Sequence, residues 1–155
     1  MTTKWLTADE QQSWRTYVET ARDLSAALEA ELEPHGLSHG DYEVLVFLSE
    51  ATDHRMRMCD LSAALRLSPS GLTRRLDSMV RSGWVERRAC ENDRRVLYAH
   101  LTPEGFAKLE DAAPTHVDGV RRHLVDTLGP DDMAALGRLF TKVRRHLTEE
   151  GLARP

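Results

Sequence analysis

Hydroxyl and guanidinium side chains gather in the middle of this 155-residue sequence, where residues 55–100 hold ten arginines and five acidic residues. The local balance of +5 contrasts with the net charge of −4 of the whole chain. Arginines and hydroxyl groups are donors that contact the phosphates and base edges of nucleic acids. A basic island on an acidic chain therefore indicates a polyanion site confined to one surface, although a solvated charged face has the same composition.

The segment after Leu67 has the features of a helix that reads DNA. Ser68 suits an N-cap and Pro69 the first helical position, so we expect a helix from Pro69 to about Ser82 with Gly83 after its end. Its expected buried side is Leu72, Leu76, Met79 and Val80. The opposite side is polar and carries Ser70, Thr73, Arg74 and Asp77. Short hydroxyl side chains near a helix N-terminus allow close approach to the major groove, and arginine makes a bidentate contact with guanine. The same pattern also suits any amphipathic surface helix.

Two short segments rich in Val, Tyr and Trp follow, Trp84–Arg87 and Val96–Leu101, and the polar loop between them predicts an antiparallel hairpin. The arginines around this loop are Arg87, Arg88, Arg94 and Arg95. A projecting hairpin tip can place an arginine in the narrow minor groove. Asp93 would hold a neighbouring guanidinium in one rotamer and leave the tip positive. A salt-bridged surface turn is the alternative.

The elements around these motifs are predicted to be helical. An apolar stripe over residues 8–32 indicates one long helix that ends before Pro34 and Gly36, and Ser38 caps a second helix to about Glu50. Residues 51–57 are expected to form a polar connection, and a short helix is expected over residues 58–65. Thr102 and Pro103 then open a helical tail to about residue 150, which Gly129 and Pro130 split in two.

Two stretches together, "LSPSGLTRRLDSMVRSGWVERR" and "DRRVLYAHLTPEG", resemble the bacterial MarR family of transcriptional regulators. The resemblance covers nearly the whole chain. It implies a mainly α fold with a small β-hairpin wing, that is, a winged helix-turn-helix with N- and C-terminal dimerisation helices. The implied regions are a dimerisation helix over 1–36, a DNA-binding region over 37–101 and further dimerisation helices over 102–155.

The resemblance also implies how such a chain would bind DNA. The helix Pro69–Ser82 would read the major groove and Arg95 would enter the minor groove. The predicted contact residues for duplex DNA are Ser68, Ser70, Gly71, Thr73, Arg74, Arg75, Arg88, Asp93, Arg94 and Arg95. Two-fold symmetry of a homodimer makes the operator a near-palindrome with half-sites about 10 base pairs apart.

A homodimer is expected from the apolar pattern as well. The N-terminal stripe needs covering, and the central module is too small to cover it together with Met133, Leu136, Leu139, Phe140 and Val143. A partner chain would cover these positions.

A small aromatic carboxylate is the ligand we expect to release such a repressor from DNA, because related regulators bind such acids between their dimerisation helices and DNA-binding lobe. Arg15 would pair with the carboxylate between Trp14 and Tyr17, and His39 and Tyr42 would donate hydrogen bonds. An exposed arginine, a histidine near a helix cap and a core tyrosine are the alternative interpretation.

Other functions find less support in the sequence. Glycine-rich phosphate loops, HExxH and GxSxG are absent, so an enzyme is not expected, and neither is a cofactor. Seven scattered histidines, with no HxxxH pair on one helix, disfavour a metal site. Cys59 is expected to pack in the interior and Cys90 to be an inert surface thiol. The alternative functions are a winged-helix redox-responsive regulator and a protein-interaction module. Apolar runs are too short for a membrane span, so we expect a cytoplasmic protein.

Overall fold

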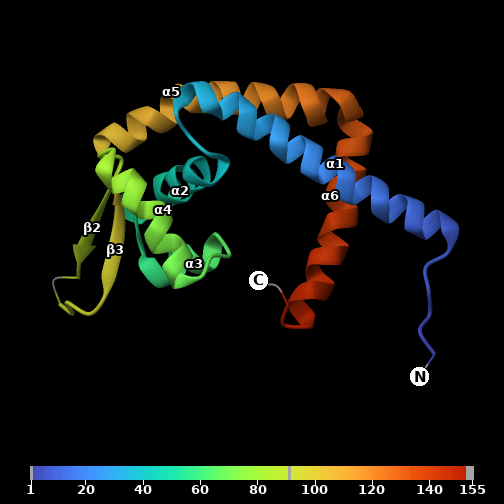
Figure 1. Ribbon diagram of the computed structural model, residues 1–155, viewed down its shortest axis with the longest axis horizontal. Coiled ribbons are helices and arrows are strands. Elements are labelled where there is room, and N and C mark those ends of the chain that lie inside the picture. The colour runs from blue at the N-terminus through green and yellow to red at the C-terminus, as the bar shows by residue number, and fades with distance from the viewer. Residues whose placement is uncertain (1, 91, 153–155) are drawn as a thin grey trace. The chain divides into compact units, whose positions relative to one another are not determined.

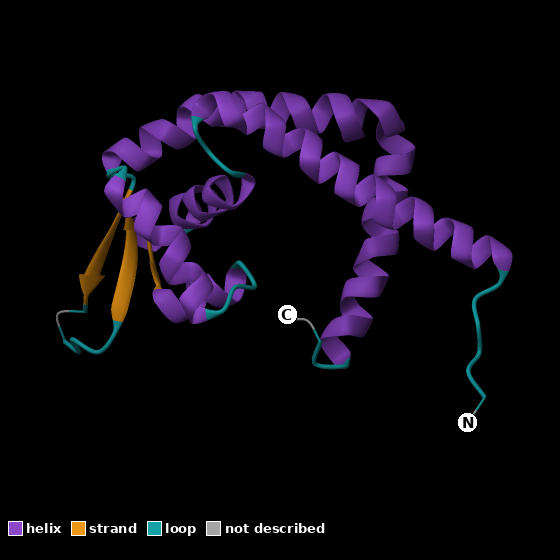
Figure 2. Ribbon diagram, viewed as in Figure 1, coloured by secondary structure: helices purple, strands orange, loops and turns teal. Residues whose placement is uncertain are grey.

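The computed structural model describes residues 2–90 and 92–152, and it divides into two compact units after His116. Helices make up most of the chain, and a small three-stranded sheet lies in the first unit (Figure 1 and Figure 2). The predicted mainly α fold with a β wing is confirmed.

The first two helices begin at residues that cap them. In α1 (Ala8–Leu32), the Thr7 hydroxyl accepts from the Glu10 amide and the Glu10 carboxylate accepts from the Thr7 amide. In α2 (His39–Glu50), Ser38 and Asp41 form the same reciprocal pair. Each capping box satisfies amides that have no partner inside the helix. Both helices therefore lie where the sequence predicts them.

The helix-turn-helix consists of α3 (Met58–Ala64) and α4 (Pro69–Arg81). Between them, Arg66 has a left-handed φ of 55°. Ser68 caps α4, and Gly83 follows its end with a φ of 74°, a conformation that glycine adopts without steric cost. The buried side of α4 holds Leu72, Leu76 and Met79, as predicted. Val80 was wrongly placed there, since 37% of it is exposed.

The sheet has one strand more than the sequence predicts. The hairpin is formed by β2 (Val85–Ala89) and β3 (Leu97–Leu101), and β1 (Arg55–Arg57) pairs with the other edge of β3. The strand order is β1-β3-β2 and both pairings are antiparallel. The expected connection over residues 51–57 is therefore corrected at its last three residues.

A single hydrophobic core holds the first unit together. Its fully buried large side chains come from α1, α2, α3, α4 and β2: Leu32, Val44, Leu45, Leu48, Leu61, Leu72, Leu76, Met79 and Val85. Ala99 of β3 and Ala112 of α5 (Pro103–Val120) complete it. Thr102 fixes the start of α5, because its hydroxyl accepts from the Gly105 amide and donates to the Gly83 carbonyl oxygen. This core sets α4 and the hairpin on one body.

The second unit contains the end of α5, a five-residue π-helical segment (Arg121–Val125) and α6 (Asp126–Glu149). Gly129 is non-helical inside α6, which confirms the predicted break in the tail, whereas the π-helical segment was not predicted. The described part of α6 has no buried residue. None of the helices in the described residues has the length and apolar character needed to cross a membrane.

Candidate nucleic-acid interface

The N-terminal half of α4 presents the polar surface predicted from the sequence. Ser68, Ser70, Thr73 and Arg74 are exposed, and Gly71 is half-buried. The Ser68 hydroxyl accepts from the Gly71 amide at 3.1 Å, and the Thr73 hydroxyl donates to the Pro69 carbonyl oxygen at 2.9 Å. Because these short side chains form hydrogen bonds with their own backbone, they do not project far from the helix. A duplex can therefore approach the helix closely.

Arg75 differs from its neighbour Arg74, because it turns toward α2. Its Nη1 donates to the Ser38 hydroxyl at 3.3 Å and lies 3.6 Å from Asp41 Oδ1. Its guanidinium occupies the space where a side chain at Gly40 would begin. The structure thus gives Arg75 a contact inside the protein that the sequence prediction, which placed it among the DNA contacts, did not include.

The hairpin tip is cationic and exposed. The side chain of Arg95 is 92% exposed, and Arg94 is also exposed. Asp93 Oδ1 accepts from the Arg95 amide at 3.0 Å and from its Nε at 3.3 Å. The carboxylate therefore orients the guanidinium as expected. Glu91 of the same loop lies outside the described residues.

Arg87 joins the hairpin to α4. Its Nη2 donates to the Thr73 carbonyl oxygen and to Asp77 Oδ1, both at 2.8 Å. The sequence grouped Arg87 with the arginines of the tip and did not predict this role, because the contact depends on the packing of two distant segments. Arg88, the next residue, faces the other side of the sheet, where its Nε donates to Glu86 at 2.8 Å.

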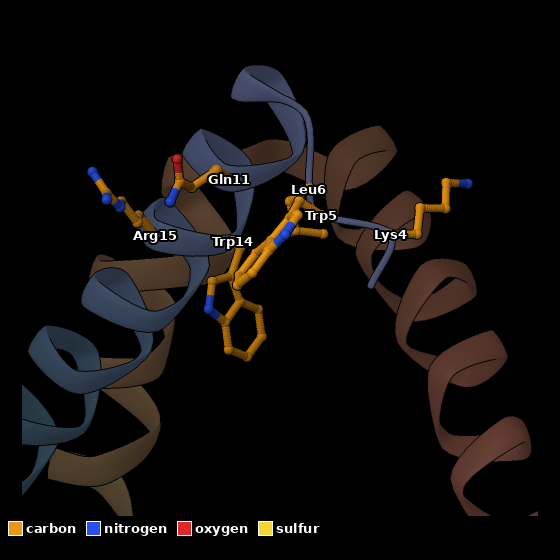
Figure 3. Close-up of a pocket in the computed structure, with 6 residues that line it drawn as sticks. All are labelled: Lys4, Trp5, Leu6, Gln11, Trp14 and Arg15. Carbon is orange, nitrogen blue, oxygen red and sulfur yellow. The ribbon is translucent and has the colours of Figure 1, made fainter. Parts of the chain in front are cut away.

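The five predicted ligand residues form two separate groups in one chain. Trp14 and Arg15 line a pocket of about 470 Å³ together with Lys4, Trp5, Leu6 and Gln11 (Figure 3). The Tyr17 ring lies 5.7 Å from that of Trp14. In the close-up the two indoles lie between Arg15 and Lys4, whose charged ends point away from them. This group combines aromatic surface with two cations.

The second group lies at the start of α2. The His116 ring lies 4.4 Å from that of Tyr42 and 5.7 Å from that of His39. Tyr17 lies about fifteen helical residues before the C-terminal end of α1, the end that leads to α2, which is roughly 20 Å at 1.5 Å per residue. The two groups therefore do not meet within one chain. The sequence missed His116, since nothing in its local pattern connects it with residues so far away.

Burial shapes the electrostatics of the second group. It lowers the pKa of His116, the nearby His39 lowers it further, and Glu31 opposes the change. Burial also raises the pKa of Tyr42. The His116 Nδ1 is buried and has no hydrogen-bond partner among the described residues.

The cysteines and acidic or imidazole side chains form no metal site in the described part of the chain. Cys59, which was expected to pack in the interior, is exposed, because it lies in the first turn of α3 on the side away from Leu61. Cys90 is half-buried in the hairpin loop.

Comparisons with known proteins agree on one family. A family model described as the MarR family matches residues 37–97. AbsC of Streptomyces coelicolor, a MarR family transcriptional regulator, is 44% identical with a TM-score of 0.90, over 95% of this chain and 99% of that one. Sco3205 of the same organism, solved in complex with DNA, is 37% identical with a TM-score of 0.89, over 94% and 92%. The transcriptional repressor YetL of Bacillus subtilis is 29% identical over 79% of this chain and 75% of its own length.

Proposed function

This chain belongs to the MarR family of transcriptional regulators, which are not enzymes, and from that premise we propose that it represses transcription by binding duplex DNA through α4 and the hairpin wing. The observation that carries the proposal is the bridge from Arg87 to α4. These hydrogen bonds fix the wing relative to α4. The exposed side chains of Arg74 on α4 and Arg95 at the wing tip therefore belong to one compact unit. The structure of Sco3205 in complex with DNA supports DNA as the partner.

Each group at this surface has a distinct task. Ser68, Ser70, Gly71 and Thr73 allow α4 to enter the major groove, and Arg74 contacts a base edge there. Arg94 and Arg95 bind at the minor groove, with Asp93 as the residue that orients Arg95. Arg88 contacts a backbone phosphate. Arg75 joins the interface only if it leaves its contact with Ser38 and Asp41.

Arg95→Ala tests this interface. We expect operator affinity to fall by about 1 to 3 kcal/mol with no change in thermal stability, because the side chain is 92% exposed and packs on little else. Fluorescence anisotropy with a duplex selected by the protein from a random library measures the affinity. Arg22→Ala, an exposed arginine on α1, is the matched control and should bind as wild type. Equal affinities of wild type and Arg95→Ala would remove Arg95 from the interface.

The regulator is proposed to act as a homodimer on a near-palindromic operator. The three proposed regions are the dimerisation helix in 1–36, the DNA-binding region in 37–101 and the dimerisation helices in 102–155. Exposed apolar side chains at both ends of the chain support this: Trp5, Leu6, Trp14, Tyr17, Val117, Leu139, Phe140 and Val143. Burying them between two chains removes apolar area from water. Sedimentation should give a dimer at micromolar concentration, and a folded monomer there would contradict the proposal.

A small aromatic carboxylate is proposed to release the protein from DNA. The pocket at Trp14 and Arg15 supports this, because two indoles offer stacking surfaces while Arg15 and Lys4 supply positive charge. The Arg15 side chain must turn toward the indoles to pair with the carboxylate. His39 and Tyr42 form the other proposed ligand group, with His116 beside them. Release requires that the ligand binds the DNA-incompetent arrangement more tightly.

Calorimetry with benzoate, salicylate and hydroxycinnamate tests the ligand and locates its site. If the N-terminal pocket is correct, Arg15→Ala keeps operator binding and loses the ligand response, a coupling of about 1 to 3 kcal/mol, whereas His39→Ala keeps both. The reverse result would move the ligand to the start of α2. If none of the three acids binds, the ligand proposal is wrong and the DNA-binding proposal is unaffected.

A further inference from the structure

The side of the sheet that faces away from the core is rich in arginine. In the pairing register, Arg55 and Glu86 lie beside His100, while Arg57 and Arg88 lie beside Tyr98. Side chains alternate between the two faces of a sheet, and Val85 and Ala99 are buried on the inner one. The outer face therefore carries three arginines, a histidine and a tyrosine with one carboxylate.

A pocket of about 380 Å³ opens on this face. Arg55, Arg88, Tyr98 and His100 line it from all three strands, and Asn92 lines it from the hairpin loop. The Arg55 guanidinium lies 5.5 Å from the centre of the Tyr98 ring, and the Tyr98 hydroxyl accepts from Arg57 Nε at 3.2 Å. The hydrogen bond from Arg57 fixes the Tyr98 ring, and the cation–π contact with that ring holds Arg55 at the pocket wall.

Two carboxylates pair with the arginines that line the pocket. Arg55 Nη2 lies 3.4 Å from Asp53, and Arg88 Nε donates to Glu86. A guanidinium carries five N–H donors, so these contacts leave donors for a ligand. The pKa of His100 is lowered, first by burial and then by Arg88 and Arg55, against an opposing effect of Glu86. The arginines thus outweigh the carboxylate at the imidazole.

We propose that this pocket binds a phosphate group, with Arg55 and Arg88 as the cationic clamp and with His100 and Asn92 as hydrogen-bond partners. Two arginines at one oxyanion provide charge-assisted hydrogen bonds, which are about twice as strong as neutral ones. The phosphate belongs either to the backbone of DNA next to the wing or to a free phosphorylated molecule. The first source rests on the proposed DNA-binding function, and the second does not.

The imidazole resonance of His100 in NMR spectra reports on the pocket, and His100→Asn identifies that resonance. Titration of the full-length protein with inorganic phosphate and with pyrophosphate should shift it to saturation, whereas sodium chloride at the same ionic strength should not. The bound oxyanion should also raise the pKa of His100, because an anion favours the imidazolium.

A double variant and a matched control separate a built pocket from diffuse charge. Arg55→Gln with Arg88→Gln should weaken pyrophosphate binding at least tenfold, while Arg81→Gln removes an exposed charge of α4 outside the pocket lining and should weaken it less than threefold. Thermal melts of each variant check that the fold remains. If the two variants lose the same pyrophosphate affinity for each charge removed, the attraction is diffuse and the proposed phosphate pocket is wrong.

Salt dependence of DNA binding distinguishes the two phosphate sources. If a backbone phosphate occupies the pocket, Arg55→Gln lowers the slope of log affinity against log salt by about 1 for a selected duplex. An unchanged slope with a phosphate-sensitive His100 assigns the pocket to a free phosphorylated molecule. An unchanged slope with a His100 resonance that phosphate moves no more than chloride does overturns the proposal. Failure to select any duplex would instead reject the DNA-binding function, and the anion titration would still stand.

Discussion

The middle of this chain and its two ends place their apolar side chains differently. Every buried hydrophobic side chain of the described residues lies between Leu28 and Ala112. Before and after that span, Trp14, Leu139 and Val143 are each more than half exposed. The middle builds its own core, so it can hold α4 and the wing rigidly, whereas the ends have apolar surface without a core. The comparison teaches that the middle carries the buried core of the described residues, and that the exposed apolar side chains gather at the ends, where we proposed that two chains associate.

The strongest way to break this comparison is to charge one end. Leu139→Asp with Val143→Asp should raise the dimer dissociation constant at least 100-fold, about 3 kcal/mol, because unpaired carboxylates would be buried between the chains. Analytical ultracentrifugation measures the constant. Thr141→Asp on the same helix, outside the apolar positions, is the control and should leave the dimer intact. A double variant that dimerises as wild type would show that these positions are not the interface.

The second prediction concerns the core of the middle. Leu76→Ala should lower the free energy of unfolding by about 2 to 5 kcal/mol, since the side chain is fully buried in α4 and its removal leaves a cavity. Urea unfolding at fixed protein concentration measures the loss. Val80→Ala on the same helix, 37% exposed, should cost less than about 1 kcal/mol. Similar costs at both positions would show that α4 does not pack as described.

The third prediction concerns pH. Because the folded state lowers the pKa of His116 from 6.5, the unfolded chain takes up this proton more readily, and the stability contributed by the neutral ring is lost as pH falls below about 6.5. Thermal melts between pH 7.5 and 5.5 should show a falling midpoint, and His116→Gln should make the fall shallower. The exposed His146 is the control, and its replacement by Gln should leave the slope unchanged. An unaltered slope in His116→Gln would contradict the burial of this ring.

The smallest expected effect sharpens the description of the turn between α3 and α4. Arg66→Gly should raise the free energy of unfolding by about 0.5 kcal/mol, because a left-handed φ costs arginine about 1 to 2 kcal/mol and the extra freedom of glycine in the unfolded chain offsets part of that gain. Arg81→Gly, inside helical α4, should change the stability by a similar amount in the opposite direction. A loss of stability in Arg66→Gly would show that the arginine side chain contributes more than its backbone costs.

The sequence was sufficient for features whose cause is local. Ser38, Ser68 and Thr102 cap the helices they were expected to cap. Gly83 follows the end of α4 and Gly129 interrupts the helical tail, as predicted. Hydrogen bonds between a cap and residues three positions away can be recognised in the pattern of a few residues. The polar face of α4 and the cationic tip of the wing are of this kind.

Features that depend on distant contacts were missed. The pattern Arg55–Met56–Arg57 is too short to indicate a strand by itself. It forms β1 because β3 offers a free edge, and nothing within Arg55–Arg57 predicts that partner. Arg75 was listed with Arg74 among the predicted DNA contacts, but its contact with Asp41 depends on how α2 packs. His116 joins Tyr42 through the same kind of tertiary contact.

The contact between Arg75 and Gly40 has a consequence for engineering a new operator preference. An obvious strategy is to graft the exposed α4 residues of a relative onto this chain. Ser70, Thr73 and Arg74 can be exchanged in this way, because they contact little beyond α4 itself. Arg75 cannot be transferred independently, since it fits only where residue 40 lacks a side chain. Donor and recipient must therefore be matched at both positions, and the Arg75–Gly40 pair is the unit of exchange.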